Sequence, residues 1–322
     1  MLIHLIIPSL DLHDHQALIE HAPSLESLIA QGQAHDGQWP GFENRVAETL
    51  GFEMSSNPVP YAALIRHALG LVSEGHWLCA TPVFLEVGIE KILLHDLNAP
   101  SLAGKEASAL IEAFNQHFAE DGLSIELDRS GYWFIRLPEQ RVIHTQPLSM
   151  ARGQSIYPLL PGGDQSAYWH GWMNEVQMLF FNHPVNIGRE HRGEKPVNGL
   201  WLWGEGEIME PVQTGWDLVM ADDSVSKALA HFTGVEVLPL DEGIPYEGHY
   251  KRVLVVVDEL QTSTVHGDYD TWKKAIKKLE SELFRPLCDA WNHRKIKELS
   301  IEGDSVRIEV PERSRWRFWR RC

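Results

Sequence analysis

Two short and almost entirely apolar runs constrain the fold of this chain more than any other feature of its sequence. Residues 2–7 read LIHLII and residues 252–257 read RVLVVV, and a loop-favouring residue, Pro8 or Asp258, follows each run. A strand buried on both faces needs apolar side chains at nearly every position, whereas a strand with one solvated face alternates. The two runs therefore predict inner strands of a mostly parallel sheet in an α/β fold.

Helical segments separate the predicted strands of the first and last parts of the chain. Residues 23–31 place leucine and isoleucine at helical spacing between Pro23 and Gly32, and residues 77–82 predict another inner strand. Further α/β elements are expected near the end of the chain: strands at 200–203, 217–220 and 235–239, a helix at 269–283 and a hairpin at 297–310.

The middle of the chain has a different character. It predicts a strand at 91–95, a helix at 102–120, a hairpin across 123–137 and a helix at 168–181, which is an α+β pattern. We therefore expect a smaller α+β domain, residues 86–194, inserted into an α/β core formed by residues 1–85 and 195–322.

Charge and cysteine content narrow the classes of partner. The formal net charge of −17 argues against nucleic acid, because phosphate backbones attract basic surfaces. Three cysteines without CxxC spacing favour a reducing cytoplasm, and no apolar run approaches the roughly 20 residues of a membrane span. The last segment, residues 313–321 (RSRWRFWRR), is basic and aromatic and favours a docked amphipathic tail over a nucleic-acid site.

Candidate ligand-binding residues follow the predicted strands, because open α/β sheets bind ligands beyond the carboxyl ends of their strands. Ser9 and Asp11 follow the first strand, and Asp258, His266 and Asp268 follow residues 252–257. Carboxylates and imidazoles together bind divalent metals, so Asp11, Asp258, His266 and Asp268 are candidate metal ligands. The structural alternative, which spacing alone favours, is that Asp268 caps the following helix and His266 lies in the turn before it.

A second group of candidates lies in residues 182–206, NHPVNIGREHRGEKPVNGLWLWGEG. Arg189 has the geometry to clamp a phosphate or carboxylate, beside Asn186 and Asn198. Gly204 and Gly206 would let backbone amides approach an anion. The structural alternative is a polar domain junction, in which the amides bond backbone groups and the glycines make a tight turn.

The same stretch resembles a block of the archaeal-type cofactor-independent phosphoglycerate mutases. The resemblance falls on Asn186, Arg189, Gly193, Pro196, Asn198, Gly204 and Gly206. A bacterial branch of that superfamily, the RpfE-type regulatory proteins, resembles the chain more closely and along most of its length. The matching segments are IIPSL, NEVQMLFFNHPVN, LWLWG, GDYDTW and the terminal RFWRR.

The resemblance implies an alkaline-phosphatase-like core with an inserted domain. Active members hold two divalent metals, usually manganese or zinc, on aspartates and histidines at strand ends, and a serine carries the phosphoryl group. Two metals suit this chemistry because they neutralise the attacking and leaving oxygens together. Ser9 is the candidate for that serine.

The chain departs from the active members at two motifs. Their aspartate-glycine pair after the first strand is Pro8-Ser9 here, and no histidine follows Ser300 where they carry T-x-DHG. We therefore expect a mutase-related protein with a degenerate metal site and no metal cofactor, which binds a small anionic ligand or a protein partner in a regulatory role. The alternative is an active phosphotransferase that uses manganese or zinc on a phosphomonoester. Three histidines near the first strand keep that alternative open: His4, His13 and His15.

Overall fold

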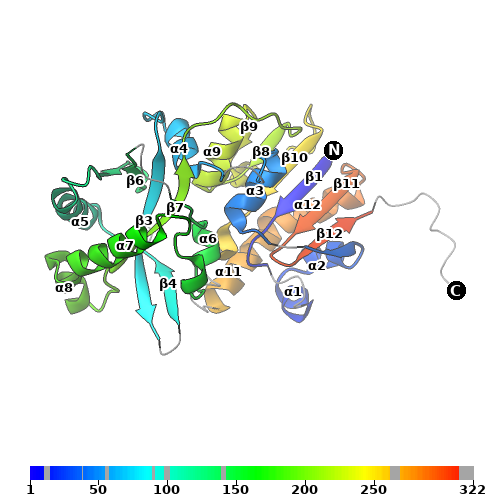
Figure 1. Cartoon of the computed structure of the whole chain (residues 1–322). Helices are drawn as coiled ribbons and strands as arrows, with labels where there is room; N and C mark the ends of the chain where they lie inside the picture. The colour runs from blue at the N-terminus through cyan, green and yellow to red at the C-terminus, as the bar shows by residue number, and fades with distance from the viewer. Residues whose placement is uncertain are drawn as a thin grey trace. The chain divides into compact units, whose positions relative to one another are not determined.

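The chain divides into two compact units. The computed structural model describes residues 1–10, 15–37, 39–54, 58–88, 91–97, 102–138, 143–261 and 269–311 (Figure 1). Unit 1 combines Met1–Pro40 with Gln213–Cys322, and unit 2 is the continuous stretch Gly41–Val212.

A seven-stranded sheet forms the centre of unit 1, in the order β2-β12-β11-β1-β10-β8-β9. The neighbours from β11 to β9 are all parallel, whereas β12 pairs antiparallel with β11 and with β2. The prediction of a mostly parallel sheet in a mixed α/β fold is therefore confirmed. The strands are β1 (Leu2–Ile6), β2 (Gln33–Asp36), β8 (Leu218–Met220), β9 (Glu236–Leu238), β10 (Arg252–Val256), β11 (Glu298–Glu302) and β12 (Val306–Val310).

Both apolar runs of the sequence lie at the centre of this sheet. β1 lies between β10 and β11, with Leu2 opposite Arg252 and Glu298. Ile3 and Leu5 of β1 are fully buried in the main core of the unit. Burial of each such side chain contributes about 1.5–3 kcal/mol, which explains why these strands are apolar. Four helices contribute to this core: α1 (His15–His21), α2 (Pro23–Ile29), α11 (Tyr269–Leu279) and α12 (Arg285–Asn292).

A buried carboxylate from another part of the chain accepts hydrogen bonds at the amino-terminal end of α2. The N-cap residue, Ala22, has no side chain that can accept a hydrogen bond from the first turn. Glu280 accepts instead, from the main-chain N–H of Ser24 at 3.2 and 3.3 Å and from its hydroxyl at 2.5 Å. Glu280 opens a π-helical turn, Glu280–Phe284, between α11 and α12. The predicted helix 269–283 therefore ends its α-helical part at Leu279.

Unit 2 is built on a five-stranded antiparallel sheet. Its strands run in the order β4-β3-β6-β5, and β7 also pairs with β3. They are β3 (Trp77–Val87), β4 (Ile92–Asp96), β5 (Ile125–Leu127), β6 (Trp133–Arg136) and β7 (Gly199–Gly206). The main helices are α3 (Phe42–Leu50), α4 (Tyr61–Ala68), α5 (Gly104–His117), α7 (Ser166–Phe181) and α8 (Pro184–His191), with a short α6 (Leu148–Ala151).

Aromatic side chains join α5 to α7 in the core of unit 2. The rings of Phe114 and Phe118 lie 4.7 Å apart, and Trp172 contacts them at 5.6 and 5.5 Å. Trp169 completes the group 5.9 Å from Trp172. All four are almost fully buried, and tilted or edge-on rings at these distances add stability beyond their buried area.

The unit boundaries differ from those that the sequence indicated. They fall after Pro40 and Val212, whereas the sequence placed the change of character after residues 85 and 194. The assignment of residues 77–82 and 200–203 to the parallel sheet is wrong, because β3 and β7 pair antiparallel with each other, with Ala80 opposite Leu202. A strand buried on both faces reads as apolar in either kind of sheet, so composition did not separate the two.

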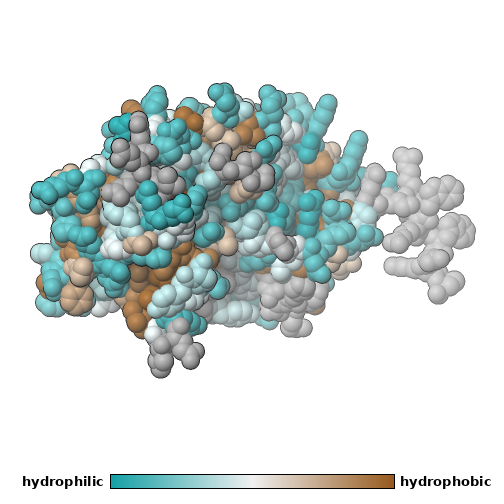
Figure 2. All heavy atoms as spheres, in the orientation of Figure 1, coloured by the Kyte–Doolittle hydropathy of each residue, from teal (hydrophilic) through white to brown (hydrophobic). Residues whose placement is uncertain are grey.

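The visible surface is mostly hydrophilic, with hydrophobic side chains gathered over the β3 and β4 region (Figure 2). Val87 at the end of β3 is 70% exposed, and Met178 and Phe181 of α7 are 70% and 73% exposed. None of the helices in the described ranges has the length and hydropathy of a membrane span.

Candidate functional site

The carboxyl ends of four neighbouring parallel strands bring polar residues to one edge of the unit 1 sheet. In spatial order, Asp304 lies just beyond β11, Ser9 beyond β1, Asp258 beyond β10 and Asp222 beyond β8. Ligands bind at this edge in open α/β sheets, so these residues form the first candidate site.

Ser9 has an unusual backbone conformation at this edge. Its φ is +60°, in the left-handed region that residues other than glycine seldom adopt. Its main-chain N–H donates to the carboxylate of Asp304, 3.0 and 3.1 Å from the two oxygens. A charge-assisted hydrogen bond of this kind offsets the cost of the strained backbone. The first strand is thereby tied at its end to the turn between β11 and β12.

His4 is engaged by two side chains of the neighbouring strand. Its Nδ1 lies 2.5 Å from the hydroxyl of Ser300, and its Nε2 lies 3.2 Å from the carboxylate of Glu302. The ring of Trp216 stacks on the imidazole with centroids 6.1 Å apart. His4 and Glu302 are 4% and 6% exposed, so the pair is buried. The structure does not describe the side chains of His13 and His15, and these candidates stay untested.

The predicted metal ligands fall mostly outside the described residues. Asp11, His266 and Asp268 lie outside them, and only Asp258 is placed, two residues past the end of β10 and next to the buried Val257. Within the described ranges, no three His, Cys, Asp or Glu side chains form a group that could hold a metal ion. The donors that are described at this edge therefore do not make up the ligand set of manganese or zinc.

Asn186 lies within unit 2, and its amide bonds the backbone on both sides. The side chain donates to the carbonyls of Phe180 (2.8 Å) and Val197 (2.7 Å) and accepts from the N–H of Val197 (2.8 Å). It is 1% exposed. The amide thus joins the end of α7 to the chain that enters β7. It bonds backbone groups, as the structural alternative expected, but inside unit 2 and not at a junction between two domains.

Asn198 makes a similar pair of backbone contacts. Its side chain accepts from the N–H of Leu85 (2.6 Å) and donates to the carbonyl of the same residue (2.9 Å). This pattern continues the antiparallel ladder between β3 and β7 by one residue. The side chain therefore extends the sheet at the place where β7 begins.

Arg189 is buried in a network of charges within unit 2. Its Nε donates to the carbonyl of Lys195 at 2.8 Å, and its NH1 lies 2.7 Å from Glu106 and 3.5 Å from Glu194. Partial burial acts to raise the pKa of Glu106, but hydrogen bonds from Arg189 and Arg192 hold that pKa below its ordinary value. The guanidinium is 2% exposed and already compensated by carboxylates.

Gly204 and Gly206 lie inside β7, an antiparallel strand that continues past the strand predicted at residues 200–203. Both have positive φ, +70° and +141°. A Cβ at Gly204 would lie 2.8 Å from Cβ of Tyr61, and one at Gly206 would lie 2.7 Å from Cβ of Pro60. The two glycines are therefore explained by the close approach of β7 to the start of α4.

Sequence reasoning missed the two contacts that define the carboxyl edge. Ser9–Asp304 and His4–Glu302 each join residues almost 300 positions apart. A histidine inside an otherwise apolar strand was the one available signal, since a buried imidazole needs a polar partner.

No family model matches the chain. A solved protein of Pyrococcus horikoshii resembles it with a TM-score of 0.52 over 95% of this chain and 86% of that one, at 12% sequence identity. At this identity the likeness shows the fold alone.

Several phosphoglycerate mutases are similar to the chain in sequence. The chain is 23% identical to the 2,3-bisphosphoglycerate-independent phosphoglycerate mutase of Methanosarcina barkeri, over 82% of this chain and 73% of that protein. It is 28% identical to the corresponding mutase 2 of Methanothermobacter thermautotrophicus, over 67% of this chain and 59% of that protein. The chain is therefore a homologue of the cofactor-independent phosphoglycerate mutases.

Proposed function

We propose that this chain is a regulatory relative of the phosphoglycerate mutases, of the RpfE type, which has lost the two-metal centre and acts through a protein partner. The relationship to the mutases supports the first part of this proposal. Fold and ancestry do not guarantee chemistry, and the residues at the sheet edge support the loss of the metal centre.

The observation that carries the proposal is that the polar groups at the end of β1 already bond to other groups of the protein. Pro8 and Ser9 stand where active mutases carry an aspartate-glycine pair, and the proline side chain offers no metal ligand. Nearby carboxylates already have protein partners: Asp304 accepts from the N–H of Ser9, and Glu302 pairs with His4. Hydrogen bonds within the protein thus take up oxygens that a metal would need.

The contacts of the 182–206 stretch favour a protein partner over a small anionic ligand. Asn186, Asn198 and Arg189 make the structural contacts described above, and Arg189 has Glu106 as a counter-ion. An anion at Arg189 would have to displace that buried ion pair, at a cost of several kcal/mol.

One observation favours the active phosphotransferase as a second candidate. Ser9 follows β1, and Asp258 follows the adjacent parallel strand β10, so a hydroxyl and a carboxylate meet the same edge. In that candidate Ser9 would carry the phosphoryl group, and Asp258 would be one ligand of the manganese or zinc.

Elemental analysis of the full chain tests the proposal. The protein is expressed with added manganese and zinc, dialysed, and compared with the Methanosarcina barkeri mutase treated in the same way. We expect far less than one metal per chain and no interconversion of 2- and 3-phosphoglycerate. About two metals per chain, as two-metal catalysis requires, with turnover that Asp258→Asn abolishes, would establish the second candidate instead.

A further inference from the structure

Helix α7 has two opposite faces, one buried in unit 2 and one in water. The buried face packs in the core of the unit: Trp169, Trp172, Val176 and Phe180. The residues of the exposed face are spaced alternately by four and three positions: Ala167, Gly171, Asn174, Met178 and Phe181. We call this second set the exposed stripe of α7. Its spacing averages 3.5 residues, which is the repeat by which one helix packs along another.

The exposed stripe is apolar at its carboxyl-terminal end, where Met178 and Phe181 are 70% and 73% exposed. A helix with one apolar face is complete once that face is buried, whereas α7 keeps a second apolar surface in water. Glu175 is the single Asp, Glu, Lys or Arg residue of the helix, in a chain whose formal net charge is −17. Two copies of an acidic chain repel each other least where they meet through a surface with few charges.

The sizes of its residues make the stripe complementary to an antiparallel copy of itself. The small residues lie at one end (Ala167 and Gly171), and the large residues lie at the other (Met178 and Phe181). Asn174 lies midway. When two copies align antiparallel about Asn174, Phe181 of one chain lies opposite Ala167 of the other. Met178 lies opposite Gly171 in the same alignment, so each large side chain fills the space above a small one.

Gly171 and Asn174 favour this alignment for separate reasons. Apart from the backbone of α7 and the adjacent residues, no described atom lies within 4 Å of a Cβ placed at Gly171, so a second helix can approach closely there. Asn174 is exposed, and the two-fold axis brings its amide to the amide of the second copy. An amide both donates and accepts, so the two can hydrogen-bond to each other. A single asparagine in such a stripe fixes the register of a helix pair.

We propose that the chain forms a homodimer in which the exposed stripes of two α7 helices pack antiparallel around a two-fold axis at Asn174. The stripe is about 21 Å long, since an α-helix rises ~1.5 Å per residue. One helix per chain makes an interface at the small end of specific interfaces, so the dissociation constant should be on the order of 10 μM. The inference is independent of the proposed function, since it uses no residue of the carboxyl edge and requires neither the presence nor the loss of a metal centre.

Sedimentation velocity of the full-length chain in reducing buffer tests the proposal, over concentrations of about 1–200 μM. We expect a shift from monomer to dimer as the concentration rises. Phe181→Ser should raise the dissociation constant at least about tenfold, because an apolar contact is lost on both sides of the axis.

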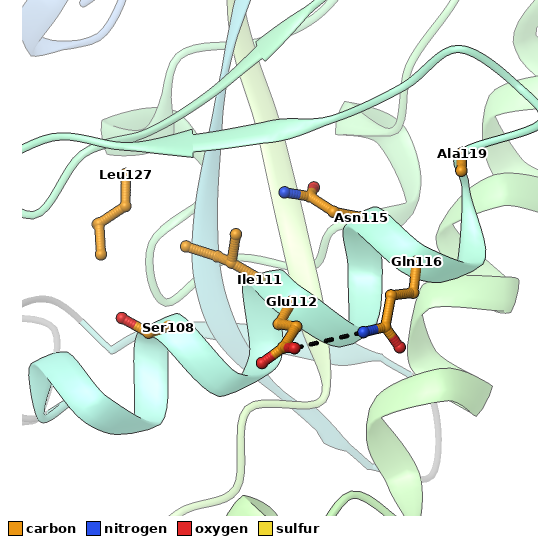
Figure 3. A pocket seen from close by; sticks show the side chains of 7 residues that line it. All are labelled: Ser108, Ile111, Glu112, Asn115, Gln116, Ala119 and Leu127. Carbon is orange, nitrogen blue, oxygen red and sulfur yellow. Dashed lines mark hydrogen bonds between the residues drawn. The ribbon is translucent and has the colours of Figure 1, made fainter.

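Leu127→Ser is the matched control and should leave dimerisation unchanged. Leu127 is also an exposed apolar side chain of unit 2, but it lines the open cleft between α5 and β5 and not the stripe (Figure 3). A chain that stays monomeric at about 200 μM, or a Phe181→Ser variant that dimerises like the wild type, overturns the proposal.

An exchange of side-chain sizes tests the antiparallel register. Gly171→Met puts two long side chains opposite each other and should weaken dimerisation about tenfold. Adding Met178→Ala makes room again, so the double variant should dimerise within about threefold of the wild type. Circular dichroism checks that both variants are folded, which we expect because the two positions are exposed. A double variant that dimerises no more tightly than Gly171→Met alone overturns the proposed packing.

Glu175 tests the orientation of the two helices by charge. It follows Asn174 directly, so antiparallel packing brings the two Glu175 carboxylates to the same side of the axis, each 2.7 Å from His117 of its own chain. Glu175→Gln should therefore tighten dimerisation about twofold at low salt, and the gain should vanish at about 0.5 M salt. Glu190→Gln, at an exposed residue of α8, changes the net charge equally and is the control. A gain at Glu175 no larger than that at Glu190 contradicts the antiparallel orientation.

Discussion

Glu106→Gln is expected to destabilise unit 2 by about 2–3 kcal/mol, because it leaves a buried guanidinium without its main counter-ion. Arg189 is 2% exposed, and Glu106 contacts its NH1 at 2.7 Å. Breaking a buried ion pair from one side costs about 3–5 kcal/mol. Glu194, 3.5 Å from Arg189 and 43% exposed, supplies part of the lost compensation, which lowers the expected cost.

The effect of this substitution depends on pH in a defined direction. The pKa of Glu106 in the folded chain lies below its ordinary value. A carboxyl with a depressed pKa contributes stability above its unfolded pKa, near 4.3, and that contribution is lost as the pH falls through the folded pKa. The difference between wild type and variant should therefore be full at pH 7 and shrink below about pH 4.

Hydrogen exchange followed by mass spectrometry is the appropriate assay, since it reports the opening of α5 and α8 separately from unit 1. Glu112→Gln is the matched control, because Glu112 lies on the same helix and is exposed, and its carboxylate accepts a hydrogen bond from Gln116. We expect the control to change the opening free energy by less than about 0.5 kcal/mol. A Glu106→Gln variant as stable as this control at pH 7 would refute the ion-pair argument.

Three further outcomes follow from contacts described above. Gly204→Ala should cost at least about 2 kcal/mol more in thermal unfolding than Gly234→Ala, because both glycines have φ near +70° but only Gly204 would bring a Cβ within 2.8 Å of Tyr61; equal costs would remove the steric explanation. Asn186→Ala should lower the free energy of urea unfolding by about 3 kcal/mol, since three buried backbone partners lose their bonds, and a loss below about 1 kcal/mol would contradict this role. Main-chain N–H groups hold the pKa of Asp217 below its ordinary value, so Asp217→Asn should cost stability at neutral pH and little below about pH 3, as checked by unfolding across pH.

The central parallel strands of unit 1 could be predicted from the sequence, because a strand that is buried on both faces needs a continuous apolar run. Residues 2–7 and 252–257 were predicted as inner strands, and β1 and β10 are adjacent and central. The same argument failed for β3 and β7, whose apolar runs lie in an antiparallel sheet. Apolar content reports burial, whereas strand direction depends on partners that are distant in the sequence.

Local pattern was also insufficient at the candidate site. The sequence left two interpretations open for Asn186 and Arg189, because an amide or guanidinium binds a ligand or a backbone carbonyl with the same groups. Only the position of Val197 and Glu106 in space shows which partners these side chains have. The turn at Ser9 could not be predicted either, since its hydrogen-bond partner, Asp304, is 295 residues away in the sequence.

Unit 1 is formed by two stretches of the chain that are separated by the whole of unit 2, and this affects the order in which a nascent chain folds. β1 is synthesised first, but its parallel neighbours begin at Arg252 and Glu298, so its pairing waits for about 250 further residues at the ribosome. Unit 2 is continuous and is complete by Val212. Pairing over such separations is slow, so unit 2 is expected to fold before unit 1, whose central strand β1 can pair only after β10 and β11 have been synthesised. Until then the apolar segment 2–7 stays exposed, which makes it a natural substrate for chaperones.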